Sequence, residues 1–324
     1  MTAELTYREA IAEAIGDELA SDPKVIFFGE DVGAAGGAFK TTVGLFERFG
    51  GERVLDTPIS EQAIVGAAIG SALMGLRPIA EIMFADFAGV CFDQLVNQLA
   101  KYNYLTGGQA HLPVTVRMAN GAGAGFAGQH SQSVENWFLN VPGLKIAVPG
   151  TVEDCYGLLR AAVRDDNPVL VFEHKNLFGL KGTISPRPIR LGEAALVRPG
   201  RHVTVVATQQ MRHRAVQASE HLGTEGIELE VIDPRTLVPF DDEMVAESLK
   251  RTARLLAVQE GPPGGGWGAS LIARMTERHF EYFDAPPRLL ASADTPVPYA
   301  GVLEEASMPS VQGIEQVVRE LVAF

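Results

Sequence analysis

Short runs of apolar residues alternate with stretches of helical periodicity through the first half of the chain. The apolar runs predict buried strands at residues 24–29, 78–84, 114–118, 145–148 and 169–172. Helical patterns follow Ser60 and cover 88–104 and 152–164, and Thr6 with Glu9 forms a capping box near the N-terminus. Strands that are apolar on both faces are typical of a parallel sheet covered by helices, so the pattern predicts an α/β fold.

A second alternation begins after a segment that is rich in proline and glycine. Strands are predicted at 203–207, 229–232 and 255–258, and helices at 212–222, 241–250, 267–279 and 311–322. The intervening residues break both periodicities, which is typical of a linker, and we expect one irregular strand in it. We therefore expect a first domain at 1–180, a linker at 181–200 and a smaller α/β domain at 201–324.

Composition narrows the class of protein. The chain has 324 residues, 46% of them hydrophobic, which suits two cores. A net charge of −13 disfavours binding to nucleic acid or to an anionic membrane, which requires clustered Lys and Arg. The two cysteines, Cys91 and Cys155, have no metal-ligand or disulfide spacing, and the N-terminus lacks a signal sequence. We expect a soluble cytoplasmic protein.

The segment Asp56-Thr-Pro-Ile-Ser-Glu61-Gln precedes a helix that carries no charge beyond Glu61. Ser60 is a favourable N-cap, which places Glu61 in the first helical turn. A helix without a polar face is expected to be buried, so Glu61 should enter a dry interior. An unpaired carboxylate there is costly and indicates a ligand or partner group, although the helix dipole alone also favours an acid at this position.

The loop Gly123-Ala-Gly125-Phe-Ala-Gly128 satisfies the G-x-G-x-x-G pattern of dinucleotide-binding proteins. Polar residues follow it and it is not the first strand-to-helix turn, so a Rossmann-type NAD-binding oxidoreductase is the weaker alternative. The plainer interpretation is a loop whose glycines let the backbone approach a ligand and which presents His130. Neighbouring residues give His130 no metal-ligand spacing, and no G-x-S-x-G elbow suggests a serine hydrolase.

Taken together, these segments and several others resemble one family. The chain closely resembles the β subunit of the thiamine diphosphate-dependent dehydrogenase component of 2-oxo acid dehydrogenase complexes, a group that includes pyruvate, branched-chain and acetoin enzymes. The resemblance runs from about Thr6 to the C-terminus. It rests on TPISEQ around Glu61, AEIMFADF at 80–87, DQ at 93–94, QHSQ at 129–132, PGLK at 142–145, DDNP at 165–168, DPRT at 233–236, VQE at 258–260 and DTPVP at 294–298.

The resemblance implies a fold and a set of site residues. The fold would be a thiamine diphosphate pyrimidine-binding domain followed by a transketolase C-terminal-like domain. Glu61 matches the carboxylate that bonds the aminopyrimidine ring, Phe87 an aromatic near that ring, and His130 the active-site histidine. Val90 departs from relatives that carry Gln and receives no role. A structural cation, K⁺ in our expectation, is implied near the backbone oxygens of Val114, Ala162, Asp165 and Asn167.

The resemblance also implies partners. The family binds the cofactor diphosphate through Mg²⁺ with a Gly-Asp-Gly run, and no such run occurs in this chain. We therefore expect an α₂β₂ heterotetramer in which the α subunit holds Mg²⁺. A lipoyl-bearing acyltransferase should dock on the C-terminal domain, where Glu304, Glu305, Glu320 and the Phe324 carboxylate are acidic.

The sequence does not decide the substrate, or whether the chain is catalytic. The stretches FADFAGVCFDQ and EHKNLFGLKG look nearer to the acetoin type, but pyruvate and acetoin differ too little in size for the sequence to decide between them. A non-catalytic scaffold of the same fold is a further alternative, although it would have no reason to combine Glu61, Phe87 and His130.

Overall fold

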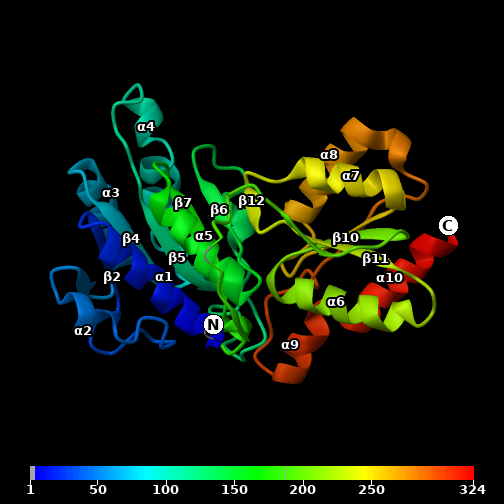
Figure 1. The fold of residues 1–324 in the computed structure, drawn as a ribbon, viewed down its shortest axis with the longest axis horizontal. Coiled ribbons are helices and arrows are strands. Elements are labelled where there is room, and N and C mark those ends of the chain that lie inside the picture. The colour runs from blue at the N-terminus through cyan, green and yellow to red at the C-terminus, as the bar shows by residue number, and fades with distance from the viewer. Residues whose placement is uncertain (1–3, 186) are drawn as a thin grey trace. The chain divides into compact units, whose positions relative to one another are not determined.

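The computed structural model describes residues 4–185 and 187–324, which fold into two compact units (Figure 1). The first unit comprises Met1–Asn120 and Trp137–Leu191, and the second comprises Gly121–Asn136 and Gly192–Phe324. The segment that carries the glycine-rich loop and His130 therefore belongs to the second unit by its contacts, although strands of the first unit flank it in the sequence.

The first unit contains a parallel sheet in the order β6-β7-β5-β4-β2-β3. The predicted strands of this region are confirmed, with small shifts at their ends. The strand bounds are β2 (Val25–Gly29), β3 (Val54–Asp56), β4 (Arg77–Phe84), β5 (Thr115–Asn120), β6 (Lys145–Ala147) and β7 (Val169–His174). A short antiparallel pair, β1 (Glu4–Thr6) with β8 (Lys181–Thr183), accompanies this sheet.

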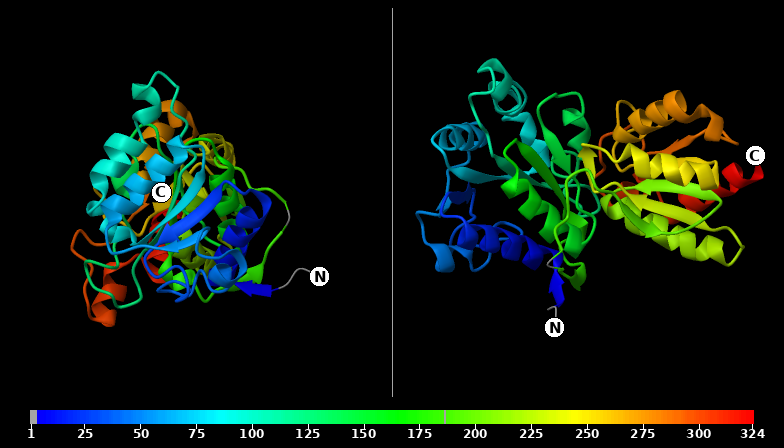
Figure 2. Two further views of the ribbon diagram at one scale, coloured as in Figure 1. Left: turned by 90° about the vertical axis from the view of Figure 1, so that its left-hand side faces the viewer. Right: turned by 45° about the horizontal axis from the view of Figure 1, so that its top comes forward.

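Helices cover both faces of this sheet. Helices α1 (Tyr7–Ser21) and α5 (Val152–Arg164) pack side by side on one face, where they bury Ile11, Ile15 and Leu159 (Figure 1). The capping box at the start of α1 is confirmed, because Thr6 and Glu9 exchange side-chain and backbone hydrogen bonds. Helix α3 (Glu61–Leu73) lies on the other face, against β4 (Figure 2). The short helices are α2 (Leu45–Phe49), η3 (Glu135–Phe138) and η4 (Lys175–Leu177).

The predicted helix at 88–104 is wrong. The chain forms three shorter pieces there: η1 (Ala85–Gly89), η2 (Gln94–Leu99) and α4 (Tyr102–Leu105). Segment η2 is a π-type turn in which the Ala100 N–H donates to the Leu95 carbonyl oxygen at 3.1 Å. Leu95 and Leu99, four residues apart, are both buried on one side, as they would be in a regular helix.

The expectation that α3 is buried all round is also wrong for this chain. Ile64, Val65 and Ile69 are buried, whereas Gly66 and Gly70 lie on an exposed face of the helix. A Cβ atom added to either glycine would meet nothing within 4 Å. The helix therefore presents an uncharged face of small residues on the surface of the chain.

The second unit is a separate α/β layer structure. Its sheet has the order β14-β13-β10-β11-β9, parallel except for β9. Helices α6 and α10 pack together on one face, and α7 and α8 on the other (Figure 1). The bounds are β9 (Ala195–Arg198), β10 (Val203–Ala207), α6 (Gln209–Gly223), β11 (Leu229–Asp233), β12 (Thr236–Val238), α7 (Asp242–Thr252), β13 (Leu255–Val258), α8 (Trp267–His279), η5 (Phe280–Tyr282), β14 (Arg288–Leu290), α9 (Gly301–Ser307) and α10 (Val311–Ala323).

All the strands and helices predicted for this second region are confirmed, whereas β12, η5, β14 and α9 were not predicted. Across residues 4–185 and 187–324, no helix combines the length and the apolar content that crossing a bilayer requires.

Candidate active site

Glu61 is the first residue of α3, as the sequence predicts, and it is only 7% exposed. Ser60 occupies the N-cap position, but its side chain forms no capping hydrogen bond, so that part of the prediction is wrong. The backbone of Ser60, at φ −166° and ψ 80°, departs from the extended geometry that aims a capping side chain at the first helical N–H groups. Glu61 is thus buried in the first turn of a helix that has no side-chain cap.

The Glu61 carboxylate keeps its acceptor capacity. Among residues 4–185 and 187–324, no hydrogen bond or ion pair involves it. Other groups respond to its charge, because burial and then Glu61 raise the pKa of Cys91 to about 12. Burial, then Glu61, also raises the pKa of Glu30. A buried carboxylate without a partner fits a ligand that brings a nitrogen donor, such as an aminopyrimidine ring.

Phe87 lies on η1, in the first unit with Glu61, and is half-buried. Its ring centroid is 5.5 Å from that of Phe84, which in turn lies 5.2 Å from Phe39. Such edge-on contacts fix the orientation of an aromatic ring. Val90, at the end of η1, is exposed. The first unit therefore supplies a buried acceptor and a cluster of aromatic rings.

His130 is half-buried and belongs to the second unit. Its backbone N–H donates to the Ala127 carbonyl oxygen at 3.2 Å, and the Gly121 N–H donates to the Gln132 carbonyl oxygen at 3.1 Å. These bonds close the glycine-rich loop at its base and place His130 beside that closure. The structure thus confirms a loop-borne histidine with polar neighbours.

Two buried carboxylates of the second unit hold this loop. Glu304 accepts hydrogen bonds from the Gly123 N–H at 2.7 Å and the Gly125 N–H at 3.1 Å. Glu260 accepts from the Ala122 N–H at 2.6 Å and the Ser133 hydroxyl at 2.9 Å. The backbone N–H groups that a dinucleotide phosphate would use are therefore occupied by Glu304, which argues against the Rossmann alternative.

The expectation that Glu304 contributes to an acidic docking surface is wrong. Its side chain is 2% exposed, because α9 directs it inward onto the loop. Its neighbour Glu305 is exposed and pairs with Arg214 at 2.7 Å. Two adjacent glutamates thus have opposite environments, which the sequence did not distinguish.

A buried charge network lies in the sheet of the first unit. Arg117 on β5 pairs with Glu81 on β4 and with Glu173 on β7, to which its Nε donates at 2.9 Å. Burial, which outweighs the attraction of Arg117, raises the pKa of Glu81 to about 7. Two carboxylates share one guanidinium, so the network can take up a proton near neutral pH.

The expected cation site has basic side chains nearby. The carbonyl oxygens of Val114 and Ala162 accept backbone N–H groups at 3.0 and 3.2 Å. Burial opposes ionisation of Asp165, but hydrogen bonds from Lys145 and Asn167 lower its pKa. The Asp165 side chain is thereby engaged by Lys145, which leaves it a poor fit as a metal ligand. The carbonyl oxygens fit a cation better, since each has a second lone pair.

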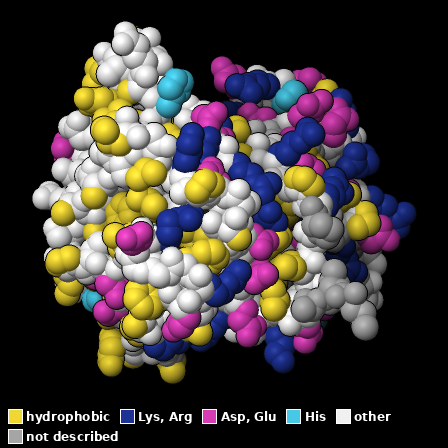
Figure 3. Space-filling model, turned by 60° about the vertical axis from the view of Figure 1, so that its left-hand side comes forward, with side chains coloured by type: hydrophobic (Ala, Val, Ile, Leu, Met, Phe, Trp, Pro, Cys, Tyr) yellow, Lys and Arg dark blue, Asp and Glu magenta, His cyan; other side chains and the backbone are white. Residues whose placement is uncertain are grey.

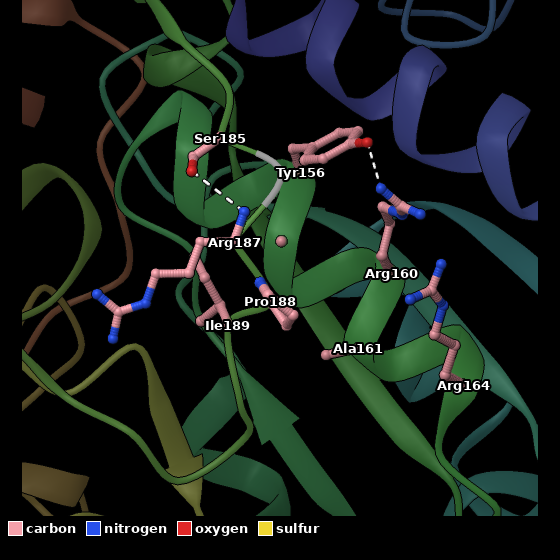
Figure 4. Close-up of a pocket in the computed structure, with 9 residues that line it drawn as sticks. Tyr156, Arg160, Ala161, Arg164, Ser185, Arg187, Pro188 and Ile189 are labelled. Carbon is pink, nitrogen blue, oxygen red and sulfur yellow. Dashed lines mark hydrogen bonds between the residues drawn. The ribbon is translucent and has the colours of Figure 1, made fainter.

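A separate pocket of about 140 Å³ opens beside α5 (Figure 4). Its lining includes Tyr156, Arg160, Arg164 and Arg187. Glu18 accepts hydrogen bonds from both Arg160 and Arg164, at 2.7 to 2.9 Å. Asp17 also pairs with Arg160 at 3.4 Å, so two carboxylates offset these two arginines and the pocket is not a concentrated anion site.

Comparison with known proteins decides the family. The chain matches the transketolase pyrimidine-binding domain over residues 3–181 and the transketolase C-terminal domain over 192–314. It is 44% identical to the acetoin:2,6-dichlorophenolindophenol oxidoreductase subunit beta of Cupriavidus necator, covering 99% of this chain and 98% of that protein. The chain belongs to the transketolase-like family of dehydrogenase β subunits.

Further similarities agree with this membership. The chain is 42% identical to the mitochondrial pyruvate dehydrogenase E1 component subunit beta-2 of Oryza sativa subsp. japonica, covering 96% of this chain and 84% of that protein. A solved structure described as a split-gene transketolase, inactive β4 tetramer, has a TM-score of 0.82 at 23% identity, with 98% and 99% of the two chains covered. This last similarity shows the fold.

Sequence reasoning missed two sets of residues. Glu81, Arg117 and Glu173 carried a usable signal, because each is a charge within an otherwise apolar strand. Glu260 and Glu304 carried no comparable signal, since their roles depend on a loop that is distant in the sequence. The structure assigns Glu61 and Phe87 to the first unit and His130 to the second.

Proposed function

We propose that this chain is the β subunit of a thiamine diphosphate-dependent dehydrogenase acting on pyruvate or a related small 2-oxo acid, or on the hydroxyketone acetoin. The observation that carries the proposal is the Glu61 carboxylate, which is almost completely buried at the start of α3 and lacks a hydrogen bond to any described residue. Such an acceptor matches a protonated ring nitrogen of the cofactor. Family membership supports the same assignment.

Each site residue has a distinct proposed role. When bound, thiamine diphosphate supplies an electron sink for breaking a bond beside a carbonyl. Glu61 would bond the pyrimidine nitrogen and share a proton with it, and the low exposure of the site would strengthen that charge-assisted hydrogen bond. Phe87 would pack near the ring. His130 would orient the substrate and serve as acid or base in acyl transfer to a lipoyl group.

The exposed face of α3 supports assembly with an α subunit. Hydrophobic and uncharged side chains predominate on the left-hand part of the surface in Figure 3. Large apolar side chains exposed on the first unit include Ile59, Leu73, Met74, Tyr104 and Leu105. Apolar surface of this extent marks an interaction site, and the glycines of α3 permit close approach of a partner. We propose an α₂β₂ heterotetramer whose α subunits contribute Mg²⁺ and the diphosphate site.

The C-terminus offers a docking surface for the lipoyl acyltransferase. A hollow of about 330 Å³ is lined by Phe280, Phe283, Pro287 and the C-terminal Phe324, whose side chain is 76% exposed. Glu320 lies on the last helix and is partly exposed. An apolar hollow flanked by the last helix, which carries Glu320, would accept a basic, partly apolar module. This surface replaces the broader acidic surface that the sequence suggested.

Two finer assignments accompany this proposal. A monovalent cation, K⁺, would bind the backbone oxygens near Val114 and Ala162 and support the end of α5. The enzyme would work in the cytoplasm, where two buried free cysteines are compatible with reducing conditions.

The deciding experiment compares the purified chain alone with the chain mixed with an α subunit that carries a Gly-Asp-Gly run. Cofactor binding is measured by calorimetry with Mg²⁺, and activity by reduction of dichlorophenolindophenol with pyruvate, acetoin or branched-chain 2-oxo acids. We expect feeble binding and no turnover from the chain alone, because most binding energy depends on the diphosphate and its metal. Both should appear on mixing.

The substrate series then identifies the member of the family. One methylene of pocket difference changes selectivity by about 1–3 kcal/mol, so the preferred substrate should exceed its nearest competitor by roughly tenfold or more. Full turnover by the chain without an α subunit would refute the β-subunit assignment. Absence of turnover with every substrate in the assembled enzyme would favour the scaffold alternative.

A further inference from the structure

The glycine-rich loop has a regular backbone pattern. Gly121, Gly123, Gly125 and Ala127 have positive φ angles of 87°, 93°, 74° and 63°, whereas the residues between them do not. Alternation of left-handed and right-handed residues turns successive backbone N–H groups toward one side, which forms a concave anion site known as a nest. Glycine adopts positive φ without strain, so the sequence is suited to this pattern.

The anion in this nest comes from the same chain. The Glu304 carboxylate accepts from the Gly123 and Gly125 N–H groups, and its side chain is buried. Glu260 accepts from the N–H of Ala122, the residue that precedes Gly123. Three backbone N–H groups of the loop therefore donate to two carboxylates of the same chain. Hydrogen bonds to ionised acceptors are roughly twice as strong as neutral ones, so this contact fixes the loop firmly.

His130 follows the nest directly. Ala127, the last residue with positive φ, accepts the His130 N–H through its carbonyl oxygen. Gly128 packs on the segment that precedes α9, because a Cβ there would lie 3.4 Å from the Val297 carbonyl oxygen. The backbone before His130 is thus held by Glu304 and by the segment that precedes α9. A change in that support should move the imidazole.

We propose that Glu304 is a positioning residue for His130, acting through the nest at Gly121–Ala127. The proposal rests on the proposed function, since it concerns the histidine assigned to acyl transfer. Glu304 does not touch the substrate or cofactor in this assignment. It fixes the loop so that the imidazole of His130 is presented in one place.

The test uses Glu304→Gln in the assembled enzyme, with Glu230→Gln as a matched control. The amide keeps one acceptor oxygen but turns an N–H₂ donor toward the nest, so one of the two loop bonds is lost. Glu230 is also a buried carboxylate of the second unit, yet it bonds Gly200 and Arg251 and not the loop. Both variants remove a buried charge, so they separate loop anchoring from general destabilisation.

The first readout is hydrogen exchange of the loop. Mass spectrometry of peptides covering 119–134 should show exchange about tenfold faster or more in Glu304→Gln, and unchanged in Glu230→Gln. Glu304→Asp, which keeps the carboxylate, should restore part of the protection. Unchanged loop exchange in Glu304→Gln would overturn the proposal, whatever the activity.

The second readout separates reaction steps. Transfer of the acyl group to a lipoyl domain should fall on the order of a hundredfold in Glu304→Gln, the scale expected for a misplaced catalytic group. Proton exchange at the thiazolium carbon, which depends on Glu61, should remain. In a His130→Ala background, Glu304→Gln should not lower the rate of acyl transfer further, because Glu304 acts on transfer only through His130.

Three other results would contradict individual parts of the proposal. A loosened loop with normal transfer would overturn the positioning role. A fully additive loss in the double variant would also overturn it, since a merely structural effect adds. Normal transfer in His130→Ala would instead refute the role proposed for that histidine, and the exchange data would still decide whether Glu304 holds the loop.

Discussion

Glu61 and Glu304 are both buried glutamates on helices, and their surroundings differ. Glu61 starts α3 in the first unit, where no described residue bonds its carboxylate. Glu304 lies on α9 in the second unit, where two backbone N–H groups satisfy its carboxylate. The first leaves its acceptor oxygens open to a ligand, because no described residue bonds to them. The second contributes stability by ordering a glycine-rich loop.

The difference separates two uses of one side chain. A satisfied carboxylate fixes the protein itself, whereas an unsatisfied one is available to something the protein binds. Glu81 forms an intermediate case, because it is buried and paired with Arg117, yet its pKa is raised to about 7. The environment of each carboxylate, and not its residue type, therefore indicates its role.

The largest expected effect comes from a substitution that tests whether Glu61 binds the cofactor. Glu61→Gln should abolish proton exchange at the thiazolium carbon in the assembled enzyme, by at least about a hundredfold, because the amide cannot share a proton with the ring. The folded chain should be about as stable, since the substitution breaks no side-chain hydrogen bond to a described residue. Proton NMR measures the exchange, and thermal unfolding measures the stability.

The control for this variant is Glu47→Gln, an exposed acid in the first turn of α2. It should change neither quantity. Near-normal proton exchange in Glu61→Gln would remove Glu61 from its role and make its burial a matter of fold alone.

The next effect concerns the surface beside Glu61. Gly70→Leu places a branched side chain on the open face of α3, where the chain itself has room. We expect the variant chain to fold normally, because leucine is the better helix former, but to fail to assemble with the α subunit. Sedimentation of the mixture measures assembly. Gly179→Leu, at another open position with no positive φ, should assemble normally. Normal assembly of Gly70→Leu would move the interface away from α3.

A moderate effect is expected on the pH dependence of stability, which Glu81 should control. Its pKa is about 7 in the folded chain and near 4.5 when exposed, so folding favours the protonated acid. The resulting stability is fully present below about pH 4.5 and is lost as the pH rises through about 7. The free energy of unfolding of the wild type should therefore decline relative to Glu81→Gln over this window, by an amount on the order of a few kcal/mol.

Urea denaturation of both proteins between pH 4.5 and 8 measures this difference. Glu47→Gln should follow the wild type throughout. Parallel curves for the wild type and Glu81→Gln would mean that Arg117 keeps Glu81 ionised over the whole range.

The smallest effect uses Cys91 to report the charge of Glu61. Burial, and next the Glu61 carboxylate, raise the pKa of Cys91 to about 12, so little thiolate exists at pH 8. Glu61→Gln removes the second cause, and alkylation of Cys91 by iodoacetamide should become a few times faster. Cys155, whose pKa is raised by burial and then by Glu173, should not respond. Equal rates at Cys91 in both proteins would mean that Glu61 carries no charge in the folded chain.

The sequence alone determined much of this protein. Helix bounds at 152–164 and 267–279, the capping box of Thr6 and Glu9, and the place of Glu61 at a helix start follow from patterns among near neighbours. These features depend on local hydrogen bonds and on which face of an element is apolar. The family was also recognisable, because its motifs recur in order along the whole chain.

Tertiary structure alone decided the rest. Gly123 and Glu304 lie 181 positions apart, so no local pattern marks Glu304 as the anchor of the loop or separates it from the exposed Glu305. The same limit applies to the exposed face of α3. Its uncharged composition predicts burial, and only the contacts of each residue in the fold show that the face is exposed. Burial and hydrogen-bond satisfaction are properties of contacts between distant segments, and only the folded chain brings those segments together.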